Sequence, residues 1–150
     1  MVNRAVVKTV SFPTRSKPHM LRVSPDGKEV WVQTAEANTN VVLSADDLSM
    51  LATEPTGKSP VTNAWTPDRR YSIVTNGKDT IAQVFDAKTF KELKRLTIGQ
   101  GGTNIGFSKD GKTAFIAVTG ANTVAVIDMR KLALESHIRA GKEPQGLIVR

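Results

Sequence analysis

The stretch from Phe107 to Asp128, FSKDGKTAFIAVTGANTVAVID, decides the fold class. Two runs rich in β-branched and aromatic residues, 114–118 and 124–127, are separated by a Gly-Ala-Asn turn and preceded by an Asp-Gly turn. Short apolar runs bounded by Gly, Asn and Asp are typical of antiparallel strands joined by tight turns. The stretch therefore predicts two neighbouring β-strands.

The turn sequences of this stretch recur along the chain at a fixed interval. SPDG, TPDR and SKDG begin at Ser24, Thr66 and Ser108, and successive starts are 42 residues apart. Glycines and prolines recur in the same register, namely Gly57, Gly99, Gly141, Pro18, Pro60 and Pro144. A fixed period of this length indicates one supersecondary unit per repeat, stacked on its neighbours.

Each repeat has the composition of four short strands. In the third repeat, runs at 103–107, 114–118, 124–127 and 134–140 are separated by turn residues, and the charge of the last run suits an exposed edge strand. Four antiparallel strands in about 42 residues match the blade of a β-propeller, whereas helical repeats need long segments with a 3.6-residue period. The predicted class is therefore all-β, a partial β-propeller of about three blades.

Residues 1–150 are predicted to form a single partial β-propeller domain. Its blade units and flanking single strands are expected at 16–57, 58–99, 100–141, 5–12 and 146–150. Three blades cannot close a ring, so the faces of the terminal blades would expose apolar area. At about 25 cal/mol per Å², a few hundred Å² of such area favours association by several kcal/mol. We therefore expect the isolated chain to bind itself or further propeller blades.

The repeat resembles that of the YVTN-type β-propeller proteins, a surface-layer-like repeat family. Phe107–Asp128 follows the pattern of a Ser-Pro-Asp-Gly turn, a YVTN-like strand, an Asn-Thr turn and a VSVID-like strand, and residues 73–76 read IVTN. The chain departs from the pattern at Lys109, Arg69 and Ser44, which stand where Pro, Gly and Asp are usual. The resemblance implies a closed ring with more blades, and a bacterial or archaeal protein of the periplasm or the cell exterior.

Composition narrows the function classes. There is no cysteine, which excludes disulfides, thiolate metal sites and cysteine nucleophiles. The formal net charge of +7 permits an anionic partner, but aromatic stacking platforms and a reading helix are missing, so no nucleic-acid partner is predicted. No apolar run reaches the roughly 18 residues of a membrane-spanning helix, and the N-terminal stretch has no export signal.

The candidate catalytic carboxylates recur with the repeat. Asp26, Asp68 and Asp110 occupy one position of the turn, and Gly27 and Gly111 follow two of them. General acid–base catalysis needs a single asymmetric pair, which a periodic set does not supply. These five residues are therefore assigned to the structure of Asx-type turns, and no catalytic residue is predicted.

Two histidines and one asparagine lie outside the periodic pattern. His19 falls in a connection that enters an inner strand near the central channel. It is a weak metal candidate, because family members that hold haem or copper have histidines in such loops. One histidine cannot form a metal site, so no metal and no cofactor are predicted. His137 lies in the polar outer run, and Asn104 breaks the period on the channel side.

Three other motifs also receive a structural assignment. Asp46 and Asp47 lie in a polar connection, and Trp31 and Trp65 are expected in the blade core. The glycines of Gly99–Gly102 are not followed by the Lys-Ser/Thr pair and the helix of a phosphate-binding loop. These motifs therefore add no candidate site.

The leading hypothesis is a non-catalytic β-propeller repeat module that acts as an interaction or ligand-binding scaffold, because periodicity explains nearly every distinctive residue. Its partners would be further blades, a protein, or a small anionic ligand on the channel face. The resemblance leaves a second class open. This is a fragment of a propeller enzyme, either a lactonase-like hydrolase or the propeller part of a quinone-, haem- or copper-dependent oxidoreductase.

Overall fold

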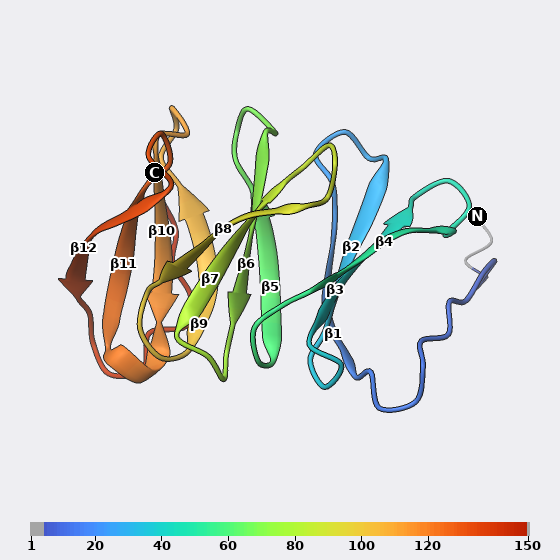
Figure 1. The fold of residues 1–150 in the computed structure, drawn as a ribbon, viewed down its shortest axis with the longest axis horizontal. Coiled ribbons are helices and arrows are strands. Elements are labelled where there is room, and N and C mark those ends of the chain that lie inside the picture. The colour runs from blue at the N-terminus through green and yellow to red at the C-terminus, as the bar shows by residue number, and fades with distance from the viewer. Residues whose placement is uncertain (1–4, 150) are drawn as a thin grey trace.

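The computed structural model describes residues 5–149, and twelve strands in this part of the chain form three sheets. The strands are β1 (Pro18–Val23), β2 (Glu29–Thr34), β3 (Thr39–Ser44), β4 (Met50–Pro55), β5 (Pro60–Trp65), β6 (Tyr71–Asn76), β7 (Ile81–Asp86), β8 (Glu92–Thr97), β9 (Gly102–Phe107), β10 (Thr113–Val118), β11 (Thr123–Asp128) and β12 (Ala133–Arg139). A single 3₁₀ turn, η1 (Thr119–Ala121), follows β10. Each sheet contains four consecutive antiparallel strands, and Figure 1 shows the three sheets side by side in chain order.

Burial explains the composition of the strands. In the middle sheet, β6 and β7 are buried along most of their length, because sheets cover both of their faces. They combine apolar residues with the buried polar side chains of Ser72, Thr75, Asn76 and Gln83. The outermost strand β8 is exposed except at the half-buried Glu92 and the buried Leu96, and it also carries Lys94 and Arg95. Charge on an edge strand opposes edge-to-edge pairing with other chains.

The strand pairing repeats with the sequence, including its irregularities. A bulge or register shift between the third and fourth strands falls at Val42/Leu43, Val84/Phe85 and Val126/Ile127, which are 42 residues apart. Bulges bend a strand and increase its twist. The three sheets therefore share one local shape, which lets each stack on the next.

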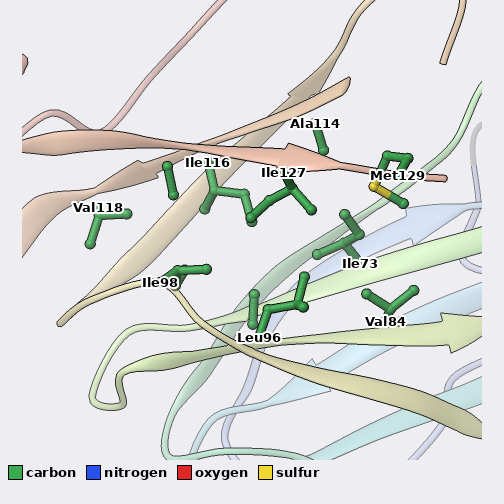
Figure 2. Close-up of a cluster of buried hydrophobic side chains, with 11 residues drawn as sticks. Ile73, Val84, Leu96, Ile98, Ala114, Ile116, Val118, Ile127 and Met129 are labelled. Carbon is green, nitrogen blue, oxygen red and sulfur yellow. The ribbon is translucent and has the colours of Figure 1, made fainter. Parts of the chain in front are cut away.

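Two interfaces between sheets hold most of the core. Eleven buried side chains form the interface between the second and third sheets: Ile73, Ala82, Val84, Leu96, Ile98, Ala114, Ile116, Val118, Ala125, Ile127 and Met129. Figure 2 shows these side chains from the two sheets pointing toward one another. The first interface is built around Trp31, whose ring lies edge-on to Trp65 and Phe85 at centroid distances of 5.6 and 6.2 Å. Trp31 therefore lies in the core, and Trp65 is half-buried against it.

The two ends of the described chain lie against the outer sheets. Val10 and Phe12 contact the buried Val32, Val41 and Leu43 of the first sheet. The single strands expected at 5–12 and 146–150 are not formed: residues 5–12 and 146–149 lie outside any strand, and residue 150 is outside the described part. The reason is that a strand needs a hydrogen-bonded neighbour, and no strand of the described chain pairs with these segments.

No helix among the described residues is long and apolar enough to cross a membrane.

Candidate functional site

The turn between the first two strands of each sheet holds its carboxylate in the same way. Asp26 Oδ1 accepts hydrogen bonds from Ser24 Oγ at 2.8 Å and from the Lys28 backbone N–H at 3.3 Å. The same two bonds recur in the other turns, from Thr66 Oγ1 and the Arg70 N–H to Asp68, and from Ser108 Oγ and the Lys112 N–H to Asp110. This geometry is that of an Asx turn.

These hydrogen bonds stabilise the ionised carboxylates. The hydroxyl of Ser108, followed by the Lys112 N–H, lowers the pKa of Asp110 to about 2. The hydroxyls of Ser24 and Thr66 are likewise the largest cause of the lowered pKa of Asp26 and Asp68. A carboxylate with a lowered pKa is a weak proton acceptor near neutral pH, so this arrangement does not suit general acid–base catalysis.

One residue of the turn adopts a left-handed backbone in all three copies. Gly27 and Gly111 have φ of 77° and 69°, a conformation that costs glycine little. Arg69 takes the equivalent place with φ of 60°. The second turn is therefore strained where its two sister turns are not.

The histidines and Asn104 lie apart from one another. His19 is exposed on β1, and its Nδ1 lies 3.2 Å from the Val61 carbonyl oxygen. His137, on β12, lies with Nε2 2.8 Å from the Ile98 carbonyl oxygen. Among residues 5–149, no group of three or more His, Asp or Glu side chains could hold a metal ion.

The acidic and glycine-rich connections are turns in the structure. Asp47 Oδ1 accepts hydrogen bonds from the Ser49 N–H at 3.0 Å and from Ser49 Oγ at 2.7 Å. These bonds, the hydroxyl first, lower the pKa of Asp47 to about 2. Gly99 and Gly101 adopt φ of 100° and 83°, and strand β9 follows them.

A buried polar cluster at the first interface departs from the repeat. Gln33 Nε2 donates to Asn40 Oδ1 at 2.9 Å and to Asn63 Oδ1 at 3.2 Å, and all three side chains are fully buried. Among residues 5–149, no hydrogen-bond partner lies near Gln33 Oε1, Asn40 Nδ2 or Trp31 Nε1. The sequence signal that could have found this cluster is a break in the period, because the residue 42 positions after Asn63 is Ile105.

Gln83 connects the first two sheets beside this cluster. Its Oε1 accepts from the Gly57 N–H at 2.7 Å. Its Nε2 donates to Glu92 Oε2 at 2.7 Å and to the Pro55 carbonyl at 3.3 Å. Both amide atoms of a fully buried glutamine are thus bonded, which is the condition for burying such a group at low cost.

Residues 142–149 contact the third sheet through a hydrogen bond that has an equivalent at the interface between the first and second sheets. The Glu143 N–H donates to Asn122 Oδ1 at 2.8 Å, and the Ser59 N–H donates to Asn38 Oδ1 at 2.8 Å. The two pairs are related by two repeat periods. Asn104 Nδ2 adds a bond to the Gln145 carbonyl at 2.9 Å. This segment therefore occupies the place of a first strand against the third sheet.

A surface groove of about 390 Å³ lies between the first and second sheets, at the end where their first turns meet. We call it the turn groove. Its lining includes the side chains of Lys28, Arg69 and Lys88, with Trp65 at the end of β5. Asp26, Glu29 and Asp68 are its carboxylates.

Neither a family model nor a curated protein matches the sequence. Solved structures match the fold. Hydrazine synthase of Kuenenia stuttgartiensis aligns with a TM-score of 0.80 and 23% identity over 93% of this chain and 40% of that chain. The RRP9 WD40 repeats align with a TM-score of 0.74 and 12% identity over 82% and 38%. A putative 6-phosphogluconolactonase of Bacteroides fragilis aligns with a TM-score of 0.74 and 17% identity over 87% and 41%.

The chain spans about two fifths of the length of each of these structures. WD40 repeats form propeller blades of four antiparallel strands, and the three sheets described above have this strand order. The predicted fold class is confirmed: the chain is all-β, a partial β-propeller of about three blades.

Proposed function

We propose that this chain is a non-catalytic YVTN-type repeat module that binds further propeller blades through the outward faces of its first and third blades. The observation that carries the proposal is the position of residues 142–149. Their contacts with Asn122 repeat those that join the first two blades, so the third blade presents a surface suited to another blade. In the isolated chain, a second copy is the available partner.

The third blade keeps an apolar hollow beside this segment. A cavity of about 360 Å³ is lined by Phe115, Val124, Ile138, Leu147, Ile148 and Val149. Ile138 and Ile148 remain 52% and 88% exposed. Exposed apolar patches on soluble proteins mark interaction surfaces, and covering this one would add to the free energy of association in proportion to the area buried.

The first blade exposes side chains that its sister blades bury. Trp65 and Phe107 pack against the preceding blade, whereas Val23, at the equivalent position, is 53% exposed. Leu21 and Met50 are exposed near it. The described residues place no preceding blade over this face. Val10 and Phe12 cover the part of it at Val32, Val41 and Leu43, while Leu21 and Val23 remain exposed to a partner.

Size-exclusion chromatography with light scattering tests the proposal at micromolar protein and moderate salt. We expect a mass above the 16.3 kDa of one chain. Ile138→Asp should shift the distribution toward the monomer, because it places a charge on the face to be buried. Leu93→Asp is the matched control, because Leu93 is similarly exposed on the outer strand of the middle blade. A monomeric peak together with a sharp cooperative melt would contradict the proposal.

A second candidate function is the propeller part of an enzyme. It is favoured by the likeness of the fold to hydrazine synthase and to a putative 6-phosphogluconolactonase. Metal analysis and the absorbance spectrum of the purified protein distinguish the two candidates. A stoichiometric metal or a chromophore would support the enzyme and would overturn the scaffold.

A further inference from the structure

The turn groove holds three cationic side chains that the rest of the protein leaves available. In the described part of the chain, the side chains of Lys28, Arg69 and Lys88 make no ion pair, while basic residues elsewhere pair with Glu36, Glu54, Glu92, Asp110 and Asp128. Lysine and arginine side chains supply only hydrogen-bond donors. The groove thus presents hydrogen-bond donors and positive charge from three side chains.

Two of the three carboxylates of the turn groove already accept hydrogen bonds from their own turns. Asp26 Oδ1 and Asp68 Oδ1 each accept a hydroxyl and a backbone N–H from their own turn. These bonds lower the pKa of both groups, so both remain ionised at neutral pH. Together with Glu29 they balance the three cations. A ligand with one compact negative group is therefore favoured over a polyanion, which the carboxylates would repel.

Arg69 is kept at the groove in a backbone conformation that glycine adopts more easily. The two equivalent turn positions are Gly27 and Gly111, and Arg69 has φ of 60°. Other non-glycine residues with positive φ, at Leu48, Phe90 and Leu132, recur at the repeat spacing and so belong to the common blade structure. Arg69 instead replaces a glycine in one copy, and local strain of this kind concentrates at functional sites.

Trp65 gives the groove an apolar wall. The side chain is half-buried and packs edge-on against Trp31. The equivalent residues in the other blades are Val23 and Phe107. An indole ring contacts a flat organic body well, and a guanidinium group pairs with a phosphate or carboxylate through two parallel hydrogen bonds.

From these four observations we propose that the turn groove binds a small organic oxyanion, with its phosphate or carboxylate group at Arg69, Lys28 and Lys88 and a flat aromatic body against Trp65. This site lies at the end of the blades where the first and second strands meet, away from the connections that surround the central channel. It does not depend on association between chains.

Isothermal titration with phenyl phosphate tests the site, and inorganic phosphate and phenol probe its two halves separately. We expect phenyl phosphate to bind more tightly than either half alone. Benzoate distinguishes a carboxylate source of the negative group from a phosphate source. Trp65→Phe should weaken phenyl phosphate several-fold while leaving inorganic phosphate unchanged.

Arg69→Gly separates binding from folding, because the two effects should have opposite signs. The variant should lose at least tenfold in affinity for phenyl phosphate, while its thermal midpoint rises because the strain is relieved. Arg69→Lys should keep part of the affinity. Lys109→Ala is the control, because Lys109 is an exposed turn residue of the third blade outside the groove. No heat of binding at millimolar phenyl phosphate would overturn the proposal, as would equal losses in Arg69→Gly and Lys109→Ala.

Discussion

Replacing Gln83 with alanine tests whether the polar contacts at the first interface hold the first two blades together. Alanine stands at the equivalent position 125 of the third blade, so the backbone accepts it. In the variant, the buried Gly57 N–H loses the acceptor that lies at 2.7 Å, Asn76 Nδ2 loses a second acceptor, and Glu92 keeps only its bonds from Arg95. A buried polar group left without a partner costs about 1–3 kcal/mol, and the lost side-chain volume adds to this. We expect the free energy of unfolding to fall by about 2–4 kcal/mol.

Urea unfolding followed by circular dichroism measures this loss. All variants are compared at one protein concentration, because association contributes to the apparent stability. The slope of the free energy against urea should not change. Gln100→Ala is the control, because Gln100 is exposed in the connection between the second and third blades. A loss for Gln83→Ala no larger than that for Gln100→Ala would mean that water takes over the contacts of the glutamine, and the reasoning would be refuted.

Three further predictions concern the turns and the C-terminal segment. Asp26→Ala and Asp110→Ala should lower the urea midpoint to a similar extent, because both carboxylates accept the same pair of bonds; an unchanged midpoint with an unchanged slope would contradict this role. Since the pKa of Asp110 is lowered from 3.8 to about 2, its contribution is present above the unfolded-state value and is lost as the pH falls toward 2. The difference between wild type and Asp110→Ala should therefore shrink over that range. Gly106→Ala would place a Cβ 2.6 Å from Leu147 Cδ1 and 2.9 Å from Val149 Cγ2. Hydrogen exchange of the backbone amides in residues 144–149 should therefore accelerate, while the amides of β10 stay protected. Equal protection in the variant and the wild type would contradict this prediction.

The strands and their order could be predicted from the sequence because both are local properties. The runs at 114–118 and 124–127 lie within β10 (Thr113–Val118) and β11 (Thr123–Asp128). Turn residues bound each run, and three copies of one pattern reinforce the assignment. Local composition alone thus determined the four-stranded unit.

The interior of the first interface could not be predicted in this way. Gln33 and Asn63 are 30 residues apart, and they meet because the first two blades stack, which the composition of a single strand does not specify. The single strands predicted beside the three sheets are absent from residues 5–12 and 146–149 for a related reason. Residues 5–12 have strand-like composition, but pairing depends on a neighbour that local sequence does not specify.

The bulge that recurs between the third and fourth strands of every blade has a genetic consequence. Its position is the same in each unit, so recombination between any two equivalent codons adds or removes a whole unit and leaves every later residue on its original face of the sheet. A deletion of an odd number of residues within a strand would instead turn its apolar side chains to the opposite face. Length variants of this gene that differ in the number of blades should therefore differ by whole multiples of the 42-residue unit.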